Sequence, residues 1–513
     1  MTKEELLKLQ NGSDIRGIAL SGVEGEEINL TEEACLKIGG AFAVWLSKKT
    51  GKPCQNLTVG IGRDSRLSGP KLEIAITKAL LSNGIKVVRC GMATTPAMFM
   101  SIVFPQTKFD GSIMITASHL PFNRNGIKFF DKDGGLEHED ITQILTLADS
   151  QNSEQNKNAN INDSKIFDLI DLYANHLKNS ICTALNSTQE QKPLSGLKIV
   201  VDSGNGASGF FVSEILEPLG ADTTGSQFLN PDGSFPNHIP NPENKQAMKA
   251  IQDATVKNKA DLGLIFDTDV DRMSAVLSDG TEVNRDSIIA MISAILAPDY
   301  PESTIVTDSV TSDRLTYFLE KVLNLKHLRY MRGYKNVINK QKELNQNGIV
   351  CPLAMETSGH GALKENYYLD DGAYLAVKLI IALAKASKQN KTLSSLIEKL
   401  PPLIEEGEFR FKITSENFKE YGAKVLETFK KRAQEKNYTL PESFEGVRIS
   451  FNDKNAKGWI LLRMSLHDPV MPMNIESENK GDLPKLIKIA KELTDGFEFL
   501  DTSCLKQRDF ILR

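Results

Sequence analysis

One pattern occurs three times in the chain and limits the folds that the chain can adopt. A run of apolar, strand-forming residues ends in Asp-Ser and a turn at 57–69 (LTVGIGRDSRLSG), 197–209 (LKIVVDSGNGASG) and 303–314 (STIVTDSVTSDR). The apolar runs predict buried strands, and their polar ends predict strand-to-helix turns. A helical pattern follows each turn, and the first one, at 70–84, ends at a glycine as helices commonly do.

Each copy of the pattern continues into a second apolar run that ends in a loop of unusual composition. These loops are TASH at 116–119, DTDVDR at 267–272 and METSGH at 355–360. A solenoid repeat would be shorter, with a period of about 20–50 residues, so this is a repeat of domains. Strands that alternate with helices form parallel sheets, which place their ligand sites at the carboxyl ends of the strands. The pattern therefore predicts three α/β domains whose loops can face one cleft.

The chain after about residue 400 has a different pattern. Short strands are predicted at 407–413, 447–451 and 458–466, and an amphipathic helix at 483–497. This pattern indicates a smaller α+β domain.

Two polar stretches divide the remaining elements. The Asn-rich stretch 149–165 predicts a linker, and SDGTEV at 278–283 predicts a hairpin turn. We therefore predict an α/β fold class with three similar mixed-sheet α/β domains and a C-terminal α+β domain around a central cleft. The expected bounds are 1–160 for the domain with the serine loop, 161–280 for the aspartate loop, 281–400 for the METSGH loop and 401–513 for the last domain.

Composition narrows the possible partners. The 513 residues carry a net charge of −5, so there is no basic excess that would favour nucleic acid or an anionic membrane. No apolar run approaches the ~20 residues of a transmembrane helix, and the N-terminal MTKEELLKLQNGSDIRG has no apolar core of a signal peptide. The 6 cysteines are scattered without a C-x-x-C pair, which fits reduced thiols. We expect a cytoplasmic protein, monomeric or homodimeric, that binds neither nucleic acid nor membranes.

The DTDVDR loop is the strongest candidate for a metal site. Asp267, Asp269 and Asp271 repel one another unless a cation neutralises them, and carboxylate oxygens favour a hard cation, Mg²⁺ before Ca²⁺ or Zn²⁺. A solvated acidic turn is the alternative, but the preceding apolar LGLIF buries the root of the loop. An EF-hand would need Gly and Glu where Arg272 and Ser278 stand, and a DxDx[T/V] phosphatase would need Thr or Val in place of Asp271. Arg272 is a natural phosphate ligand beside this site.

Ser118 is a candidate nucleophile, with His119 next to it and Lys128 after an Asn/Gly-rich turn. A Ser-His-Asp hydrolase is one interpretation, but ITASHL is not a G-x-S-x-G elbow. Adjacent side chains on an extended segment also point apart, so we expect no contact between Ser118 and His119. Beside a hard-cation site, the serine favours phosphoryl chemistry, because Mg²⁺ can neutralise a phosphate that the serine carries. For Ser118 alone, an ordinary polar strand end remains the alternative.

Three further polar stretches are candidates for ligand binding. The acid, hydroxyl and imidazole of METSGH suit a polyhydroxylated ligand, and the basic residues of RGYK (332–335) and LLRMSLHDP (461–469) suit an anion. Polar turns and solvated strand ends are the alternatives for each stretch alone. The candidate residues are Glu356, Ser358, His360, Arg332, Lys335, Arg463, Ser465 and His467.

In their order along nearly the whole chain, these motifs resemble those of the α-D-phosphohexomutase family of phosphoglucomutases, phosphomannomutases and phosphoglucosamine mutases. TASHLP is similar to the family's phosphoserine loop T-A-S-H-N-P, DTDVDR to its metal loop D-x-D-x-D-R, and METSGH to its sugar loop G-E-M-S-G-H. SDIRG is similar to the family's Y-D-I-R-G and retains Arg16. Lys128 falls on the lysine of its N-G-x-K.

The resemblance implies an intramolecular phosphotransferase that interconverts hexose 1-phosphate and hexose 6-phosphate, glucose and/or mannose. Ser118 would carry the phosphoryl group, and Mg²⁺ would be held by Ser118 and the three aspartates. Hexose 1,6-bisphosphate would be the intermediate and the activator. Arg16 and Arg272 would stabilise the transferring charge, and His119, Lys128 and His360 are the further catalytic candidates.

The last domain departs from the family pattern. The family's phosphate loop is usually R-x-S-G-T-E-P-x-x-R, whereas residues 463–476 retain Arg463, Ser465 and Pro469 but have Leu466 and His467 in place of Gly-Thr. This departure leaves two alternatives to a mutase: a hexose-1,6-bisphosphate synthase that releases the intermediate, and a non-catalytic sugar-phosphate sensor. The intact Ser118 and aspartate triad count against the sensor.

Overall fold

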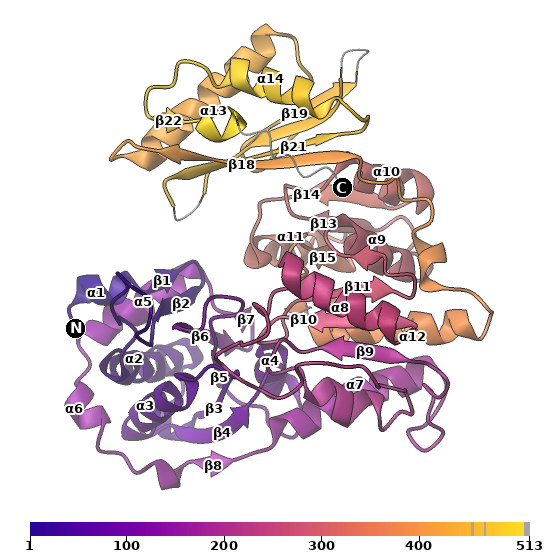
Figure 1. Ribbon diagram of the computed structural model, residues 1–513. Helices are drawn as coiled ribbons and strands as arrows, with labels where there is room; N and C mark the ends of the chain where they lie inside the picture. The colour runs from indigo at the N-terminus through magenta and orange to yellow at the C-terminus, as the bar shows by residue number, and fades with distance from the viewer. Residues whose placement is uncertain (453–455, 466–467, 507–513) are drawn as a thin grey trace. The chain divides into compact units, whose positions relative to one another are not determined.

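The computed structural model describes residues 1–452, 456–465 and 468–506 (Figure 1). The chain divides into two compact units. The first contains Met1–Asn284 and Ser358–Ser395, and the second contains Arg285–Thr357 and Leu396–Arg513. Each unit combines helices with sheets and has its own core.

The first sheet belongs to the first unit and has the strand order β1-β2-β6-β5-β3-β4-β8, with β7 paired to β6. Strands β3, β4, β5 and β8 pair in parallel, and β6 and β2 are antiparallel additions, so the sheet is mixed. The strands are β1 (Gln10–Asn11), β2 (Asp14–Ile18), β3 (Thr58–Arg63), β4 (Lys86–Met92), β5 (Gly111–Ile115), β6 (Arg124–Asp131), β7 (Gly134–Gly135) and β8 (Lys165–Ile166).

Helices around this sheet begin and end where the sequence provides caps. Helix α2 starts after Thr31, whose hydroxyl accepts the N–H of Ala34, and ends at Gly51, whose φ of 69° suits glycine. Its Phe42 packs 4.7 Å from Phe129 of the sheet, measured between ring centroids. The helices are α1 (Lys3–Leu7), α2 (Glu32–Thr50), α3 (Gly69–Ser82), α4 (Thr95–Val103), α5 (His138–Asp149) and α6 (Ser153–Asn156), with 3₁₀ turns η1 (Cys54–Asn56) and η2 (Ile161–Asp163).

The second sheet of this unit has the order β12-β11-β10-β9. Strands β9 and β10 are parallel, and β10 returns antiparallel through β11, so the aspartate loop is the connection between two fully buried strands. The strands are β9 (Ile199–Asp202), β10 (Leu262–Phe266), β11 (Met273–Leu277) and β12 (Glu282–Val283). The other elements are α7 (Leu169–Ala184), the π-helix η3 (Phe211–Leu216), α8 (Lys245–Lys257), the hairpin strands β16 (Gly361–Leu363) and β17 (Leu369–Asp370), η5 (Lys364–Asn366) and α12 (Gly372–Ser387).

The second unit begins with a parallel arrangement in which β13 lies between β14 and β15. Its elements are α9 (Asp286–Leu296), β13 (Thr304–Thr307), α10 (Asp313–Tyr317), the π-helix η4 (Phe318–Val322), β14 (Lys326–Arg329), α11 (Tyr334–Gln346) and β15 (Leu353–Met355). The short turn η6 (Leu393–Leu396) lies where the chain passes from the first unit back to the second.

The C-terminal domain of this unit is an antiparallel sheet of order β19-β20-β21-β18-β22 with two helices. Phe411, Phe429 and Leu486 are fully buried in the core that the sheet shares with α13 and α14. The elements are β18 (Glu405–Ile413), α13 (Phe418–Glu435), β19 (Val447–Asn452), β20 (Lys457–Leu462), β21 (Val470–Ser477), α14 (Leu483–Leu493), β22 (Leu500–Asp501) and η7 (Ser503–Lys506).

The predicted fold class is confirmed: three α/β domains with mixed sheets are followed by a β-rich C-terminal domain. The stretch 149–165, predicted as a linker, contains the short helix α6 and the 3₁₀ turn η2. Its Asn156 is buried, and its polar groups have partners: the backbone carbonyl accepts from Ser82 Oγ at 3.0 Å, and the side-chain amide donates to the Leu36 carbonyl at 3.1 Å.

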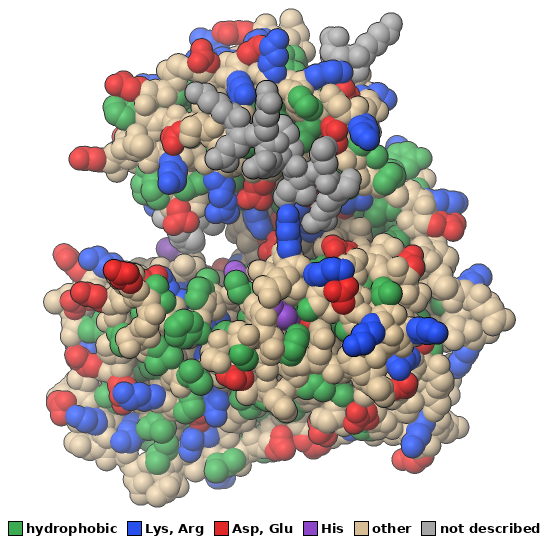
Figure 2. All heavy atoms as spheres, viewed as in Figure 1, with side chains coloured by type: hydrophobic (Ala, Val, Ile, Leu, Met, Phe, Trp, Pro, Cys, Tyr) green, Lys and Arg blue, Asp and Glu red, His purple; other side chains and the backbone are tan. Residues whose placement is uncertain are grey.

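The surface agrees with the modest net charge. On the face shown in Figure 2, basic and acidic side chains are interspersed. No helix in the described part of the chain is long and apolar enough to span a bilayer.

Candidate active site

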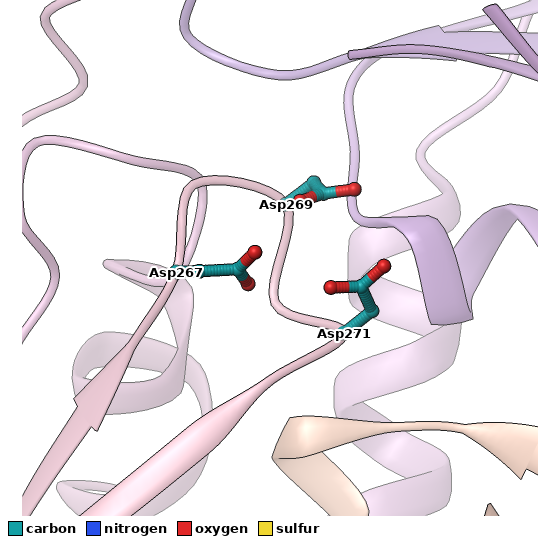
Figure 3. Close-up of side chains that lie close together, drawn as sticks. All are labelled: Asp267, Asp269 and Asp271. Carbon is teal, nitrogen blue, oxygen red and sulfur yellow. The ribbon is translucent and has the colours of Figure 1, made fainter. Parts of the chain in front are cut away.

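The aspartate loop holds three carboxyl groups in a small buried space. Asp267, Asp269 and Asp271 are at most 1% exposed, and one oxygen from each lies within 4.8 Å of the others. Figure 3 shows the three side chains projecting from the same loop with their carboxyl groups close together. The loop turns sharply at Val270, whose φ of 69° is strained for a β-branched residue, and the Val270 carbonyl accepts the N–H of Gly372 at 3.1 Å.

This donor set fits a hard cation. Asp269 Oδ1 and Asp271 Oδ1 are buried, and neither accepts a hydrogen bond from the described residues. Buried carboxylate oxygens are costly without a donor or a cation. Three oxygen ligands from one loop suit Mg²⁺, which completes its coordination with waters or substrate oxygens.

Lys128 on β6 supplies a cation to the same loop. Its Nζ lies 2.5 Å from Asp271 Oδ2 and 3.7 Å from Asp269 Oδ2. Burial alone would raise the pKa of Asp271, but Lys128 and His360 outweigh burial and hold that pKa well below its usual range. Burial and the neighbouring carboxylates of Asp271 and Asp269 raise the pKa of Asp267 well above its usual range. The loop therefore holds two neighbouring carboxyl groups whose pKa values are shifted in opposite directions, that of Asp267 upward and that of Asp271 downward.

Ser118 points into this site. Its Oγ donates to Asp267 Oδ2 at 2.7 Å and accepts from Arg272 Nη2 at 3.0 Å. The prediction that Ser118 and His119 point apart is wrong, since Ser118 Oγ and His119 Nδ1 are 3.3 Å apart. The reason is the backbone, because Ser118 has a φ of 51° and is not extended.

His119 and Arg272 both contact the Ser118 hydroxyl. A ring nitrogen of His119, Nδ1, is in close contact with Arg272 Nη2. Burial lowers the pKa of His119 to about 2, and the charges of Arg272 and Arg16 add to this effect. The imidazole is therefore neutral, and an acceptor at Nδ1 matches the guanidinium donor.

Two arginines flank the serine loop. Arg272 is 1% exposed, and its Nε and Nη2 each lie 3.2 Å from Asp267 Oδ2. Arg16 on β2 donates to the Thr116 carbonyl and pairs with Asp14 Oδ2 at 2.9 Å. Both guanidinium groups thus have fixed positions near Ser118 or its loop.

The second half of METSGH reaches the triad within the first unit. His360 Nε2 lies 3.5 Å from Asp271 Oδ1, and its Nδ1 lies 2.9 Å from Ser358 Oγ. Burial lowers the pKa of His360, although the carboxylate of Asp271 opposes the shift. The predicted residues Ser118, His119, Lys128, Arg272, His360 and the three aspartates therefore meet in one place.

The remaining candidates lie in the second unit. Glu356 Oε1 accepts the backbone N–H of Gly333 at 2.7 Å, which places the acid beside the RGYK stretch. Arg332 donates its backbone N–H to Glu445 Oε2 at 3.0 Å, and Lys335 lies in the first turn of α11.

Arg463 follows β20 and lies near the same carboxylate. Its Nη1 is 3.7 Å from Glu445 Oε1, and burial, with the charge of Arg332, lowers its pKa. Ser465 donates its N–H to the Val470 carbonyl at 2.9 Å, and its Oγ accepts the N–H of Asp468 at 3.3 Å. Leu466 and His467 lie outside the described residues.

One residue of the site was missed by the sequence analysis. Thr95, the first residue of α4, donates its hydroxyl to Asp269 Oδ2 at 2.5 Å and its backbone N–H to the Asp269 carbonyl at 2.9 Å. The sequence marks this position only as a helix start, Thr-Thr-Pro, and the contact depends on a segment 174 residues away.

Comparison with known proteins decides the family. The sequence models described as phosphoglucomutase/phosphomannomutase, alpha/beta/alpha domains I, II and III, match residues 8–155, 171–280 and 284–404. A phosphoglucomutase/phosphomannomutase of Thermococcus kodakarensis is 30% identical over 479 residues, covering 92% of this chain and 96% of that protein. The chain belongs to the α-D-phosphohexomutase family. It is thus an enzyme, an intramolecular phosphotransferase of the phosphoglucomutase/phosphomannomutase type.

The names of other relatives refer to mannose, glucose and glucosamine. A phosphomannomutase/phosphoglucomutase of Pseudomonas aeruginosa PAO1 is 28% identical, covering 92% of this chain and 94% of that protein. A phosphoglucosamine mutase of Lactobacillus johnsonii is 31% identical, covering 77% and 83%. A crystal structure of a phosphoglucomutase/phosphomannomutase family protein from Burkholderia thailandensis has the same fold, with a TM-score of 0.75, 24% identity and coverage of 97% and 99%.

Proposed function

We propose that the protein interconverts hexose 1-phosphate and hexose 6-phosphate, of glucose and/or mannose, through a phosphoserine at Ser118 and a hexose 1,6-bisphosphate. The observation that carries this proposal is the position of Ser118 Oγ, 2.7 Å from Asp267 and 3.0 Å from Arg272 at the edge of the buried aspartate triad. A hydroxyl between a guanidinium and a metal-type site is suited to holding a phosphoryl group.

The residues of the site have two kinds of proposed role: some bind charged groups, and others transfer protons. Asp267, Asp269 and Asp271 with Ser118 would hold Mg²⁺, which supplies positive charge against the phosphoryl oxygens when bound. Arg272 is close enough to donate to a phosphoryl group on Ser118, and Arg16 fixes the loop behind it.

Lys128, His360 and His119 are the proton-handling candidates. Lys128 and His360 both touch Asp271, and we propose them as the acid and base. His119 is neutral and serves as a hydrogen-bond acceptor beside Arg272.

We propose that the remaining candidate residues bind the sugar hydroxyls and the distal phosphate of the substrate. We assign the sugar hydroxyls to Glu356 and Ser358 with Arg332 and Lys335, and the distal phosphate to Arg463, Ser465 and His467. The proposal retains the four predicted domains, 1–160, 161–280, 281–400 and 401–513. A reducing, cytoplasmic compartment fits the 6 cysteines, which form no disulfide in the described chain.

The test is phosphorylation and turnover. The protein is incubated with glucose 1,6-bisphosphate and weighed intact, and the C1- and C6-phosphates of glucose, mannose and glucosamine are then assayed. One phosphoryl adduct is expected in the wild type and none in Ser118→Ala. Ser112→Ala is the matched control, because Ser112 is a buried serine on β5 whose Oγ donates to the Met98 carbonyl at 2.7 Å. Turnover by Ser118→Ala at the wild-type rate would refute the phosphoserine.

Partial release of the bisphosphate is the second candidate, and the sequence of 463–476 favours it. Leu466 and His467 replace the Gly-Thr pair with which the usual loop grips phosphate, and losing one charge-assisted bond of ~1.5–3 kcal/mol weakens binding about tenfold or more. We expect free bisphosphate in the medium and strong activation by added bisphosphate, both reduced in Leu466→Gly/His467→Thr. Sustained turnover without added or released bisphosphate would exclude this candidate.

A further inference from the structure

The aspartates of the threefold sequence repeat have no role in the chemistry described so far. Asp64, Asp202 and Asp308 lie at the carboxyl ends of the repeat strands β3, β9 and β13, and each is fully buried. A buried carboxylate must be paired, so each one has been given partners by the fold. Asp64 and Asp308 each bind a threonine of the functional loop in their domain, whereas Asp202 has other partners.

In the first domain the aspartate holds the residue two positions before Ser118. Thr116 Oγ1 donates to Asp64 Oδ2 at 2.7 Å and accepts the backbone N–H of Ser118 at 2.9 Å. The other oxygen, Asp64 Oδ1, accepts the N–H of Arg66 at 2.9 Å. One carboxylate therefore fixes the Ser118 N–H through a single hydroxyl.

Arg66 fixes the other side of the same loop. Its side chain is fully buried, and its guanidinium donates to four carbonyls between Ser118 and Arg124, in the serine loop and the turn that follows it. The contact with the Ser118 carbonyl is the closest, and the others are Leu120 at 2.6 Å, Pro121 at 2.7 Å and Arg124 at 3.0 Å. The ring of Phe235 covers the guanidinium at 5.2 Å. Only arginine offers a planar fork of five N–H donors for such a set.

These contacts explain how Ser118 holds its backbone. A non-glycine residue at a φ of 51° costs about 1–2 kcal/mol and persists only where its surroundings enforce it. Here the backbone N–H and the backbone carbonyl of Ser118 itself are both bound, the first by Thr116 and the second by Arg66. The same backbone conformation brings Ser118 Oγ to Asp267 and Arg272.

The third domain repeats the aspartate–threonine contact at the sugar loop. Asp308 Oδ2 accepts the hydroxyl of Thr357 at 2.8 Å and its N–H at 3.2 Å. Thr357 directly follows Glu356, whose carboxylate is in turn bound to the Gly333 N–H.

The second domain lacks the contact. Asp202 accepts from Gly204 N, Gln227 Nε2 and the ring of His238, while Thr268 Oγ1 of the aspartate loop has no partner among the described residues.

We propose that Asp64 with Arg66, and separately Asp308, are positioning residues: through Thr116 and Thr357 they set the conformation of the loops that carry Ser118 and Glu356. The proposal rests on the proposed function, because it assigns the first pair to the phosphoryl-transfer step and the second to sugar recognition. The aspartate loop lacks this aspartate–threonine contact, and a bound cation would hold its conformation instead.

The test compares matched variants at both sites. Thr116→Val and Thr357→Val remove the hydroxyl at nearly constant volume, and Thr116→Ser and Thr357→Ser retain it. We expect Thr116→Val to lower kcat roughly 10- to 100-fold with KM little changed, since a displaced reacting group costs about that much. We expect Thr357→Val to raise KM about tenfold, the loss of one such bond, with kcat largely preserved. Both serine variants should stay near wild type, and Arg66→Lys should behave as Thr116→Val does.

The outcomes separate the inference from the proposed function. If the wild type takes up no phosphoryl group on Ser118, the proposed function fails. If the wild type is phosphorylated and both valine variants change kcat and KM alike, or only the melting temperature, the positioning role is wrong. A kcat effect at Thr116 and a KM effect at Thr357, each rescued by serine, support it.

Discussion

Replacing Lys128 by methionine tests the electrostatics of the site without touching Ser118. Methionine keeps most of the length of the side chain and removes its charge. The ammonium lies 2.5 Å from Asp271 and 3.7 Å from Asp269, and at an effective dielectric constant of about 20 these pairs are worth roughly 7 and 4 kcal/mol. Removing Lys128 also removes the desolvation cost of its ammonium, several kcal/mol, so the net loss should be about 3–5 kcal/mol.

A second substitution, Asp271→Asn, removes the carboxylate that Lys128→Met leaves without its partner. In Lys128→Met/Asp271→Asn the charge left without its partner is also gone, so most of the lost stability should return. The measurement is calorimetric melting of the four members of the cycle without Mg²⁺. Lys128→Met should melt roughly 5–10 °C below wild type. If Lys128→Met melts with the wild type, or the double variant melts no higher than Lys128→Met, the ion pair does not stabilise the first unit as argued.

Three further predictions concern the metal, the C-terminal sheet and one glycine. Mg²⁺ at a hundredfold excess over its Kd should stabilise the protein by about 2.7 kcal/mol, and Asp269→Asn should lose both this gain and turnover; a near wild-type rate in that variant at limiting Mg²⁺ would contradict the site. Burial, with the carboxylate of Asp286, raises the pKa of Glu476 from 4.5 to about 7, so the folded form keeps a proton that the unfolded chain releases, and stability should fall by up to about 3 kcal/mol as the pH rises from 4.5 through 7. Urea titrations at both ends of this range should show the slope in wild type and a flatter one in Glu476→Gln. Gly446 has a φ of 66°, and a Cβ there would lie 2.2 Å from the Leu462 carbonyl oxygen, so Gly446→Ala should destabilise the second unit by at least about 2 kcal/mol; unchanged melting would show that the turn can relax.

The sequence predicts those parts of the fold that depend on local periodicity. The strand at 58–63, helix α3 and the hairpin after β11 follow from apolar spacing and turn residues alone. The spacing of Asp267, Asp269 and Asp271 in a short loop between two buried strands likewise predicts that their carboxyl groups lie close together.

Local reasoning fails where distant segments set the conformation. The local sequence predicts an extended Ser118, whereas Ser118 has a positive φ and its carbonyl accepts from Arg66, 52 residues earlier in the chain. Thr95 carries no signal, since its contact with Asp269 exists only after two domains have packed. The composition of 149–165 predicts a linker but does not predict the contacts of its Asn156 with Leu36 of α2 and Ser82 of α3.

The covering of Arg66 by Phe235 also bears on how the chain is made. Gly233 lies so close to the turn at Arg66 that a Cβ there would be 2.6 Å from the Arg66 Cα, so the two segments close on each other. A ribosome completes residues 1–160 well before it adds 233–235 and the aspartate loop. During synthesis, therefore, Ser118 belongs to a segment that has Arg66 but lacks its aromatic cover, the partners Asp267 and Arg272, and any carboxylate for Lys128 from the aspartate loop. The contacts of Ser118 with Asp267 and Arg272 form only when the second domain folds onto the first, so a truncated nascent chain would be released without them.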